Sequence, residues 1–280
     1  MGTPFITFLG PSNLDGYDSK NRSSAQPENI PKTFLDAMEV RETVFVEEQK
    51  VPLDNEFDSD DPRACHWVIY ASINTVTDPE VTSSSGEIIT RKKSTTRSTP
   101  IGTIRLVPFP HPPHPEPGSS YTADALETSS TIPSSPSNPN PTSTSTSPPF
   151  ITDRATTHHD GKEPYIKLGR LAVLPEFRGS GLAKLLVSSA ISWLSANPTY
   201  FNPSIKELGM ERISGEEGSG MGEVPTWKGL VCVHAQEQVA KTWAKWGFEL
   251  DEGMGEWSEE GIKHVGMFMR INLENTGPCG

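Results

Sequence analysis

Residues 165–194 decide the fold, and they read YIKLGRLAVLPEFRGSGLAKLLVSSAISWL. The first part, 165–174, is rich in apolar and β-branched residues, which predicts a mostly buried strand. Pro175 ends that strand because proline has no backbone N–H to donate to a neighbour. Beyond the glycines that follow, apolar or small residues recur at helical spacing and predict a helix with one packed face: Leu182, Leu185, Leu186, Ser189, Ala190, Trp193 and Leu194.

The turn between this strand and this helix, Arg178-Gly179-Ser180-Gly181, has the features of an anion site. The first backbone N–H groups of a helix lack internal partners, and the helix dipole places partial positive charge there. Glycines let a phosphate approach the main chain without a Cβ in the way, and Arg178 adds a guanidinium. The turn therefore favours a pyrophosphate cradle, while an ordinary strand–turn–helix joint is the alternative interpretation.

Comparison with known phosphate-binding motifs shows which kind of phosphate site this turn resembles. The P-loop pattern is absent, and the dinucleotide pattern G-x-G-x-x-G fails because Lys184 stands where its third glycine belongs. The pattern that fits is R-x-x-G-x-A, at Arg178, Gly181 and Ala183. With it, the block GRLAVLPEFRGSGLAKLLV resembles the coenzyme A strand and helix of the GNAT N-acetyltransferase superfamily. The resemblance implies acetyl-CoA as co-substrate, bound by Arg178, Gly179, Ser180, Gly181, Leu182 and Ala183, and an oxyanion-stabilising backbone amide at Leu171, Ala172 or Val173.

Composition limits what the chain can be. Only 34% of its 280 residues are hydrophobic and 26 are proline, so much of the chain cannot belong to a core. We therefore expect one N-acetyltransferase domain over 1–280, interrupted by segments of low complexity. The net charge of -12 argues against nucleic acid and anionic membranes as partners. The three scattered cysteines favour neither zinc nor disulfides, so we expect no metal and a reducing, cytoplasmic location, with the nucleus as an open alternative.

In the rest of the chain, predicted strands and helices alternate with connecting segments. We expect strands at 5–9, 65–73, 101–107, 230–234, 248–250 and 264–271, and helices at 33–48 and 235–246. Three connections interrupt them: a flexible loop at 74–100, a disordered Pro/Ser/Thr-rich insertion at 108–162 and a Gly/Pro-rich connection at 197–227. His158 and His159 lie in the insertion and are expected to be inert. Gly247 suits the left-handed position after a helix.

The resemblance extends to other segments, namely VFVEEQKVP, IGTIRL, HAQ, WGF and GIKH. They are similar to a GNAT subgroup related to glucosamine-phosphate N-acetyltransferases. This implies an α+β fold with a mixed, mostly antiparallel central sheet flanked by helices. It also implies transfer of acetyl to the primary amine of a small molecule, with an amino sugar phosphate as one candidate, by direct attack in a ternary complex. A homodimer is compatible with this assignment.

Acetyl transfer needs a group that takes a proton from the acceptor amine. The candidates are Glu56, Asp58 and His264, with His66 and Glu260 behind them. Glu56, Asp58 and Asp61 could instead form a solvated acidic loop, and His264 could be structural. His234 ends a predicted buried strand and is expected to be a satisfied core histidine.

One departure from the family pattern concerns the leaving thiolate. Trp243 occupies the position where many members have a tyrosine, and an indole N–H cannot serve as an acid. Core packing is the simpler role for Trp243. Two functions stay open: an active N-acetyltransferase, or a catalytically weak acyl-CoA-binding module whose insertion recruits protein partners.

Overall fold

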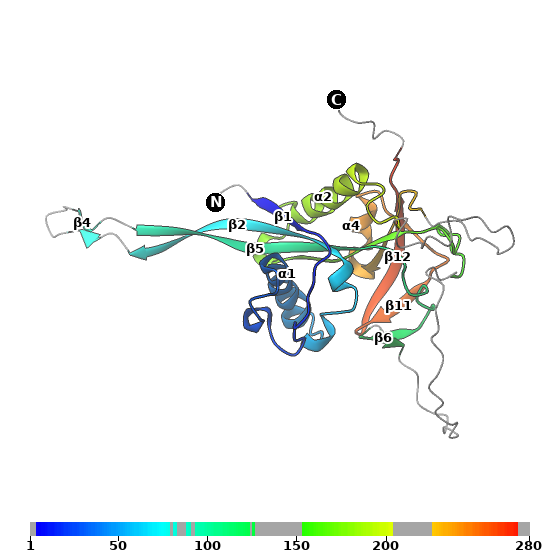
Figure 1. Cartoon of the computed structure of the whole chain (residues 1–280), viewed down its shortest axis with the longest axis horizontal. Helices are drawn as coiled ribbons and strands as arrows, with labels where there is room; N and C mark the ends of the chain where they lie inside the picture. The colour runs from blue at the N-terminus through cyan, green and yellow to red at the C-terminus, as the bar shows by residue number, and fades with distance from the viewer. Residues whose placement is uncertain are drawn as a thin grey trace, which may run out of the picture. The chain divides into compact units, whose positions relative to one another are not determined.

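The computed structural model describes residues 4–78, 81–82, 88–90, 93–123, 125–126, 153–203 and 226–273. Its contacts divide the chain into two compact units (Figure 1). Unit 1 contains Met1–Val107 and Leu168–Ser192, and unit 2 contains Pro108–Lys167 and Trp193–Gly280. Each unit combines two segments that are far apart in the sequence. A division of the chain into contiguous domains could therefore not have predicted either unit.

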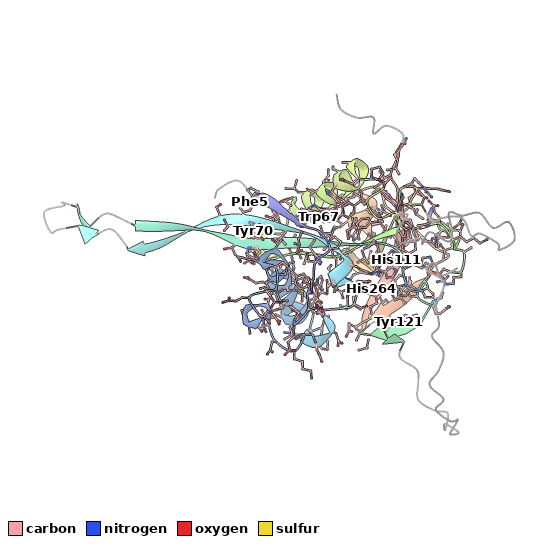
Figure 2. All side chains as sticks on the ribbon, in the orientation of Figure 1. Phe5, Trp67, Tyr70, His111, Tyr121 and His264 are labelled. Carbon is pink, nitrogen blue, oxygen red and sulfur yellow. The ribbon has the colours of Figure 1, made fainter. Side chains whose placement is uncertain are left out.

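Unit 1 is built on the strand order β1-β2-β5-β8. These strands are β1 (Phe5–Leu9), β2 (Cys65–Asp78), β5 (Lys93–Val107) and β8 (Ile166–Val173), the last of which enters this unit at Leu168. β2 runs antiparallel to both β1 and β5. On the edge strand the ring of Phe5 stacks on Tyr70 at a centroid distance of 4.9 Å (Figure 2). β1 and β8 lie where the hydrophobic pattern predicted them, whereas β2 and β5 extend beyond the predicted segments 65–73 and 101–107.

Two helices of unit 1 pack on opposite faces of this sheet. α1 (Lys32–Arg41) contributes Ala37 to a cluster with Val68 and Tyr70. Ile69 points to the other face, because successive strand residues alternate. There a Cβ built on Gly102 would meet the side chains of Ile69 and Leu186, and Leu186 belongs to α2 (Leu182–Ala196). The predicted helix at 33–48 is therefore confirmed in extent, except that it begins after Pro31 and continues from Glu42 to Glu48 as a π-helix.

The predicted flexible loop at 74–100 is corrected by the structure. β2 continues to Asp78 and β5 begins at Lys93, and the two pair antiparallel as a long ribbon with register shifts (Figure 1). Two short strands, β3 (Val81–Thr82) and β4 (Ile88–Thr90), pair with each other. Threonine-rich sequence misled the prediction, because threonine is a good strand former as well as a loop residue.

Unit 2 is built on the strand order β9-β12-β11-β6-β7, with β10 also paired to β12. The longer strands are β9 (Leu230–Gln236), β11 (Glu256–Glu259) and β12 (Ile262–Arg270). The short ones are β6 (Ser120–Thr122), β7 (Ala125–Leu126) and β10 (Glu249–Leu250). β6 pairs parallel to β11, whereas the pairs β9–β12, β10–β12, β11–β12 and β6–β7 are antiparallel, so the sheet is mixed as predicted. β6, β7 and β11 were not predicted.

The predicted disordered insertion at 108–162 is also corrected in its described parts. His114 and His159 are buried, and their rings lie against Tyr165 and Phe268. The side chain of Asp251 accepts hydrogen bonds from the backbone amides of Thr157 (3.0 Å) and His158 (2.8 Å) and from the hydroxyl of Thr156 (2.6 Å). Both ends of the insertion are thus part of the folded unit, and His159 is a core residue.

Two other connections can be compared with the prediction. The predicted helix at 235–246 is a 3-10 turn, Glu237–Val239, followed by α4 (Ala240–Ala244), and it begins after β9 has continued to Gln236. Gly247 has φ +95°, as its place after this helix predicted. Of the predicted Gly/Pro-rich connection at 197–227, residues 204–225 lie outside the described residues.

Candidate active site

The predicted cradle is an exposed turn in unit 1. Gly179 and Gly181 have φ +75° and +84°, values that side-chain-bearing residues rarely adopt, and a Cβ on either would meet nothing within 4 Å. The amide of Leu185 donates to the carbonyl of Gly181 at 3.0 Å and so closes the first turn of α2. The amides before it have no intrahelical acceptor. The sequence therefore produces an open helix N-terminus approached over bare backbone.

Arg178 stands beside this turn with its guanidinium held on both sides. Its Nε donates to the carbonyl of Val173 at 2.9 Å, and its two Nη groups donate to the carboxylate of Glu48 at 2.8 and 2.5 Å. The hydrogen bond from Arg178 lowers the pKa of Glu48. Both side chains are more than 40% exposed. An anion entering the cradle would therefore meet a guanidinium that already has an acceptor.

The strand before the turn has an irregularity close to the predicted oxyanion donors. Arg170 has φ +48°, which is unusual for a residue with a side chain. Ala172 and Val173 follow it as buried residues, and Leu171 is half-buried. Such strained positions cluster at functional sites. The structure thus places a local break in β8 one residue before Leu171.

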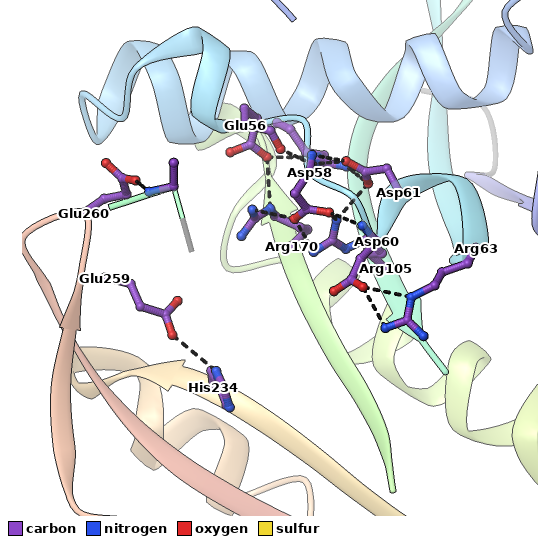
Figure 3. A network of polar contacts seen from close by, with 12 residues as sticks. Glu56, Asp58, Asp60, Asp61, Arg63, Arg105, Arg170, His234, Glu259 and Glu260 are labelled. Atoms are coloured by element: carbon purple, nitrogen blue, oxygen red, sulfur yellow. Dashed lines mark hydrogen bonds and ion pairs between the residues drawn. The ribbon is translucent and has the colours of Figure 1, made fainter. Parts of the chain in front are cut away.

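Glu56 and Asp58 are not a solvated loop but part of a buried ion-pair network in unit 1 (Figure 3). Arg41 donates from Nε to Glu56 Oε1 at 2.6 Å and from Nη1 to Asp61 Oδ1 at 2.7 Å. Arg105 binds both oxygens of Asp58, at 2.6 and 2.8 Å, and also Asp61 at 2.8 Å. The network balances three carboxylates against three guanidiniums, because Arg170 is its third cation.

Electrostatics keep these carboxylates ionised. Burial alone would raise the pKa of Asp58, but Arg105 and Arg170 lower it to about 2. Arg41 and Arg105 likewise outweigh burial and lower the pKa of Asp61. Arg170 Nε lies 3.3 Å from Glu56 Oε1. Because both oxygens of Asp58 accept hydrogen bonds from guanidinium groups, Asp58 is a weaker proton acceptor than the sequence analysis expected.

The two other candidates for the base, His66 and Glu260, both make contacts that are typical of a structural role. His66 is 1% exposed, its ring lies edge-on to Phe34, and burial lowers its pKa to about 4. Glu260 sits at a left-handed turn, φ +51°, and its carboxylate accepts the amide of Ala123 at 2.7 Å. Nδ1 of His66 has no hydrogen-bond partner among the described residues, but the side chain is closed off from solvent. The carboxylate of Glu260 already accepts a backbone amide.

His264 lies in unit 2 as part of a second polar cluster. Its Nδ1 is 2.8 Å from the carbonyl of Ile262, and its Nε2 is 3.9 Å from Glu259 Oε2. The same carboxylate accepts the indole N–H of Trp257 at 2.7 Å and faces Nδ1 of His234 at 3.2 Å (Figure 3). His234, expected to be a satisfied core histidine, has one buried ring nitrogen, Nε2, with no hydrogen-bond partner among the described residues.

Trp243 behaves as a core residue. It is 5% exposed and its ring packs edge-on against Trp246 and Phe248, at centroid distances of 5.2 and 5.1 Å. These contacts agree with the predicted role of Trp243 in core packing.

Several residues of these clusters were missed from the sequence as site members. Arg41 lies in the apolar stripe of the predicted helix at 33–48, and Glu259 belongs to no motif that the sequence analysis recognised. A charged residue within an apolar helical stripe could have marked Arg41, because arginine is almost never fully buried without a partner. Nothing local could have marked Glu259, because it reaches His234 across the intervening strand β12.

The segment that forms the glycine turn is similar to a known protein family. Residues 150–200, which hold β8, the glycine turn and α2, match the family model described as Acetyltransferase (GNAT) family. The match covers less than half of the chain, so it is a similarity of this segment alone. No curated protein matches the chain.

Solved structures that resemble the chain include three bacterial proteins. One is a candidate N-acetyltransferase from Lactobacillus plantarum, with 15% identity and a TM-score of 0.44 over 96% of this chain and 99% of that one. An acyl-CoA N-acyltransferase from Pseudomonas aeruginosa has 15% identity and a TM-score of 0.42 over 95% and 99%. Escherichia coli ElaA has 13% identity and a TM-score of 0.42 over 96% and 100%. These similarities define no substrate.

Two further findings concern the described part of the chain. It contains no group of three or more His, Cys, Asp or Glu side chains placed to hold a metal ion. None of its helices has both the length and the apolar character needed to cross a bilayer.

Proposed function

We propose that this protein is an acetyl-CoA-dependent N-acetyltransferase that acetylates the primary amine of a small molecule. The observation that carries the proposal is the turn at 178–181, where two left-handed glycines open the N-terminus of α2 within the segment that matches the acetyltransferase family. Free amides, a helix dipole and a guanidinium together suit a pyrophosphate. Acetyl-CoA would be bound there by residues 178–183, as a co-substrate and without a metal.

The reaction would proceed by direct attack of the amine on the thioester in a ternary complex, since holding both reactants in one site supplies much of the rate. A backbone amide at Leu171, Ala172 or Val173 would stabilise the oxyanion. Glu56, Asp58 and His264 remain the proposed proton-transfer groups. Among them Glu56 has the more available carboxylate, because its Oε2 has no hydrogen bond within the described residues, whereas both oxygens of Asp58 accept from arginine.

The acceptor is constrained by the charges of the site. A sugar phosphate needs a free cation, for which Arg105, Lys167 and Arg170 are the candidates. Arg105 is buried against Asp58 and Asp61, and Arg170 pairs with Glu56 and Asp58. Two of the three candidates are thus neutralised by carboxylates of the chain itself. A cationic or neutral amine fits this balance better than an amino sugar phosphate.

The test is turnover with defined amines. The full chain is incubated with acetyl-CoA and, separately, spermidine, phenylethylamine or glucosamine 6-phosphate, while free thiol is followed. Thiol release that requires an amine supports the proposal, and the order of the three rates reports the preferred charge. Acetyl-CoA binding with no turnover on any amine would instead indicate the acyl-CoA-binding module.

A pair of glycine variants tests the cradle itself. Gly181→Glu puts a carboxylate where the pyrophosphate would bind and should weaken acetyl-CoA binding by at least tenfold. Gly16→Glu is the matched control, because Gly16 also lies in unit 1, has φ +91° and has open space around its missing Cβ. Both substitutions carry a similar backbone cost, about 1–3 kcal/mol. Equal acetyl-CoA affinity in the two variants would show that the turn at 178–181 does not bind the cofactor.

A further inference from the structure

Of the residues in the ion-pair network, Arg170 alone lies in β8, the strand that holds the proposed oxyanion donors. Its Nη2 donates to Asp58 Oδ2 at 3.0 Å, and its Nε lies 3.3 Å from Glu56 Oε1 (Figure 3). The side chain of Arg170 is 27% exposed, whereas those of Glu56 and Asp58 are 3% and 10% exposed. All three residues belong to unit 1. The guanidinium is therefore held by two carboxylates that are themselves buried.

The main chain at Arg170 is left-handed inside a strand, with φ +48°. The other described residues that combine a side chain with a positive φ lie outside strands, namely Lys50, Ala123 and Glu260. Glycine takes this conformation at no steric cost, yet the adjacent Gly169 does not take it. A strained backbone persists only where the surrounding structure fixes it. The strain in β8 thus falls on the residue whose side chain is anchored by ion pairs.

The two carboxylates have partners other than Arg170. Arg41 of α1 donates to Glu56 at 2.6 Å, and Arg105 of β5 donates to both oxygens of Asp58 at 2.6 and 2.8 Å. Each carboxylate therefore has an arginine on another element, and Arg170 adds a link from this fixed group to β8. Because a guanidinium presents its N–H groups in a rigid fork, two contacts determine both its place and its orientation. The link therefore constrains the main chain of β8 at this residue.

We propose that Arg170 is a positioning residue of the acetyl transfer, whose ion pairs hold the left-handed turn of β8 that aims the backbone amides of residues 171–173 at the thioester carbonyl. The inference rests on the proposed function. A donor stabilises an oxyanion best when its direction is fixed before the charge develops. These amides follow Arg170 directly, and each peptide group is planar, so a change in the dihedral angles of Arg170 turns the peptide groups after it. Arg170 itself touches neither acetyl-CoA nor the reacting atoms.

Replacement by glycine removes the anchor without adding backbone strain. With acetyl-CoA and whichever of spermidine, phenylethylamine and glucosamine 6-phosphate reacts fastest, Arg170→Gly should lower kcat on the plateau of the pH–rate profile by about 10- to 100-fold. This is part of the loss of about 10²–10³ that follows removal of an oxyanion donor. The KM of the amine and the Kd of acetyl-CoA should stay within about twofold, because the interaction is made only in the transition state. Arg170→Lys keeps the charge but not the fork, so its kcat should lie between the wild type and Arg170→Gly.

Two controls separate the anchor from general backbone and charge effects. Lys50→Gly places glycine at another left-handed position of unit 1, φ +68°, and should leave kcat unchanged. Arg63→Gln removes a guanidinium that is 33% exposed and lies 2.7 Å from Asp60, and should also leave kcat unchanged. A loss in Arg170→Gly that is no larger than in these controls, or that is confined to the acidic limb of the pH–rate profile, would overturn the assignment.

NMR spectra give a result that does not depend on turnover. In the wild type, the Arg170 guanidinium should show separately resolved Nη resonances at low temperature, because ion pairing slows its rotation. In apo Arg170→Gly, the amides of residues 171–173 should shift and exchange with solvent faster than they do in Lys50→Gly. Averaged Nη resonances in the wild type, or unchanged amides in the variant, would also refute the anchoring role. A wild type that releases no thiol with any of the three amines refutes the proposed function instead, and the spectra still decide whether Arg170 holds β8.

Discussion

Glu48 should compete with acetyl-CoA for Arg178, and removing its charge should tighten binding. The carboxylate makes two hydrogen bonds to the guanidinium, at 2.8 and 2.5 Å, at the edge of the glycine turn. Glu48→Gln keeps the shape of the side chain and abolishes the ion pair. An exposed pair of this kind is worth about 0.2–1 kcal/mol. Its release should therefore lower the Kd of acetyl-CoA by about 1.4- to 5-fold.

Calorimetric titration of the apo protein with acetyl-CoA measures this effect. The gain should be larger at 50 mM than at 300 mM salt, because exposed charges are screened. Glu47→Gln is the matched control, since Glu47 is the adjacent exposed glutamate and pairs with Arg22 at 2.6 Å. In an Arg178→Ala background most of the gain from Glu48→Gln should disappear.

The opposite sign would refute the reasoning. If Glu48→Gln binds acetyl-CoA more weakly than the wild type, the glutamate positions Arg178 for the cofactor instead of competing for it. If the gain is the same with and without Arg178, the effect is a general change in charge and the guanidinium is not a ligand.

Three further predictions concern stability. Arg105→Met leaves Asp58 and Asp61 buried with one cation fewer and should cost about 3–5 kcal/mol of unfolding free energy in urea. Asp251→Asn removes the charge that holds the insertion and should cost about 2–3 kcal/mol by the same measurement. In acid, the pKa of Asp58 is lowered to about 2 in the folded state, so its stabilisation is complete above about pH 4 and is lost as the pH falls towards 2.

Each of the three has a distinct control. Arg22→Met removes an arginine that is 50% exposed and should cost less than about 1 kcal/mol. Asp160→Asn affects an exposed aspartate that accepts only local amides, from Lys162 and Glu163, and should be mild. Asp58→Asn should flatten the acid limb of the stability profile. Costs that are equal in test and control variants would show that burial and pairing do not govern these sites.

Local sequence patterns were enough to predict the glycine turn and the strand and helix on either side of it. Strand β8, the left-handed glycines and α2 lie within some thirty consecutive residues, so periodicity and turn chemistry determine them directly. The ion-pair network could not be found in this way. Arg170 and Asp58 are 112 positions apart in the sequence, and only the tertiary fold brings their side chains within 3.0 Å. Composition also failed at the described ends of the insertion, where a few side-chain hydrogen bonds anchor polar sequence that has too little apolar surface to fold alone.

The network has a consequence for how the proton-transfer groups should be ranked. Asp58 Oδ1 accepts from Arg105 and from the amide of Asp60, and its Oδ2 accepts from Arg105 and Arg170. A proton on Asp58 would have to displace two guanidinium contacts. One oxygen of Glu56, Oε2, accepts no hydrogen bond within the described residues, whereas both oxygens of Asp58 accept from arginine. Glu56→Gln should therefore lower kcat/KM more than Asp58→Asn does.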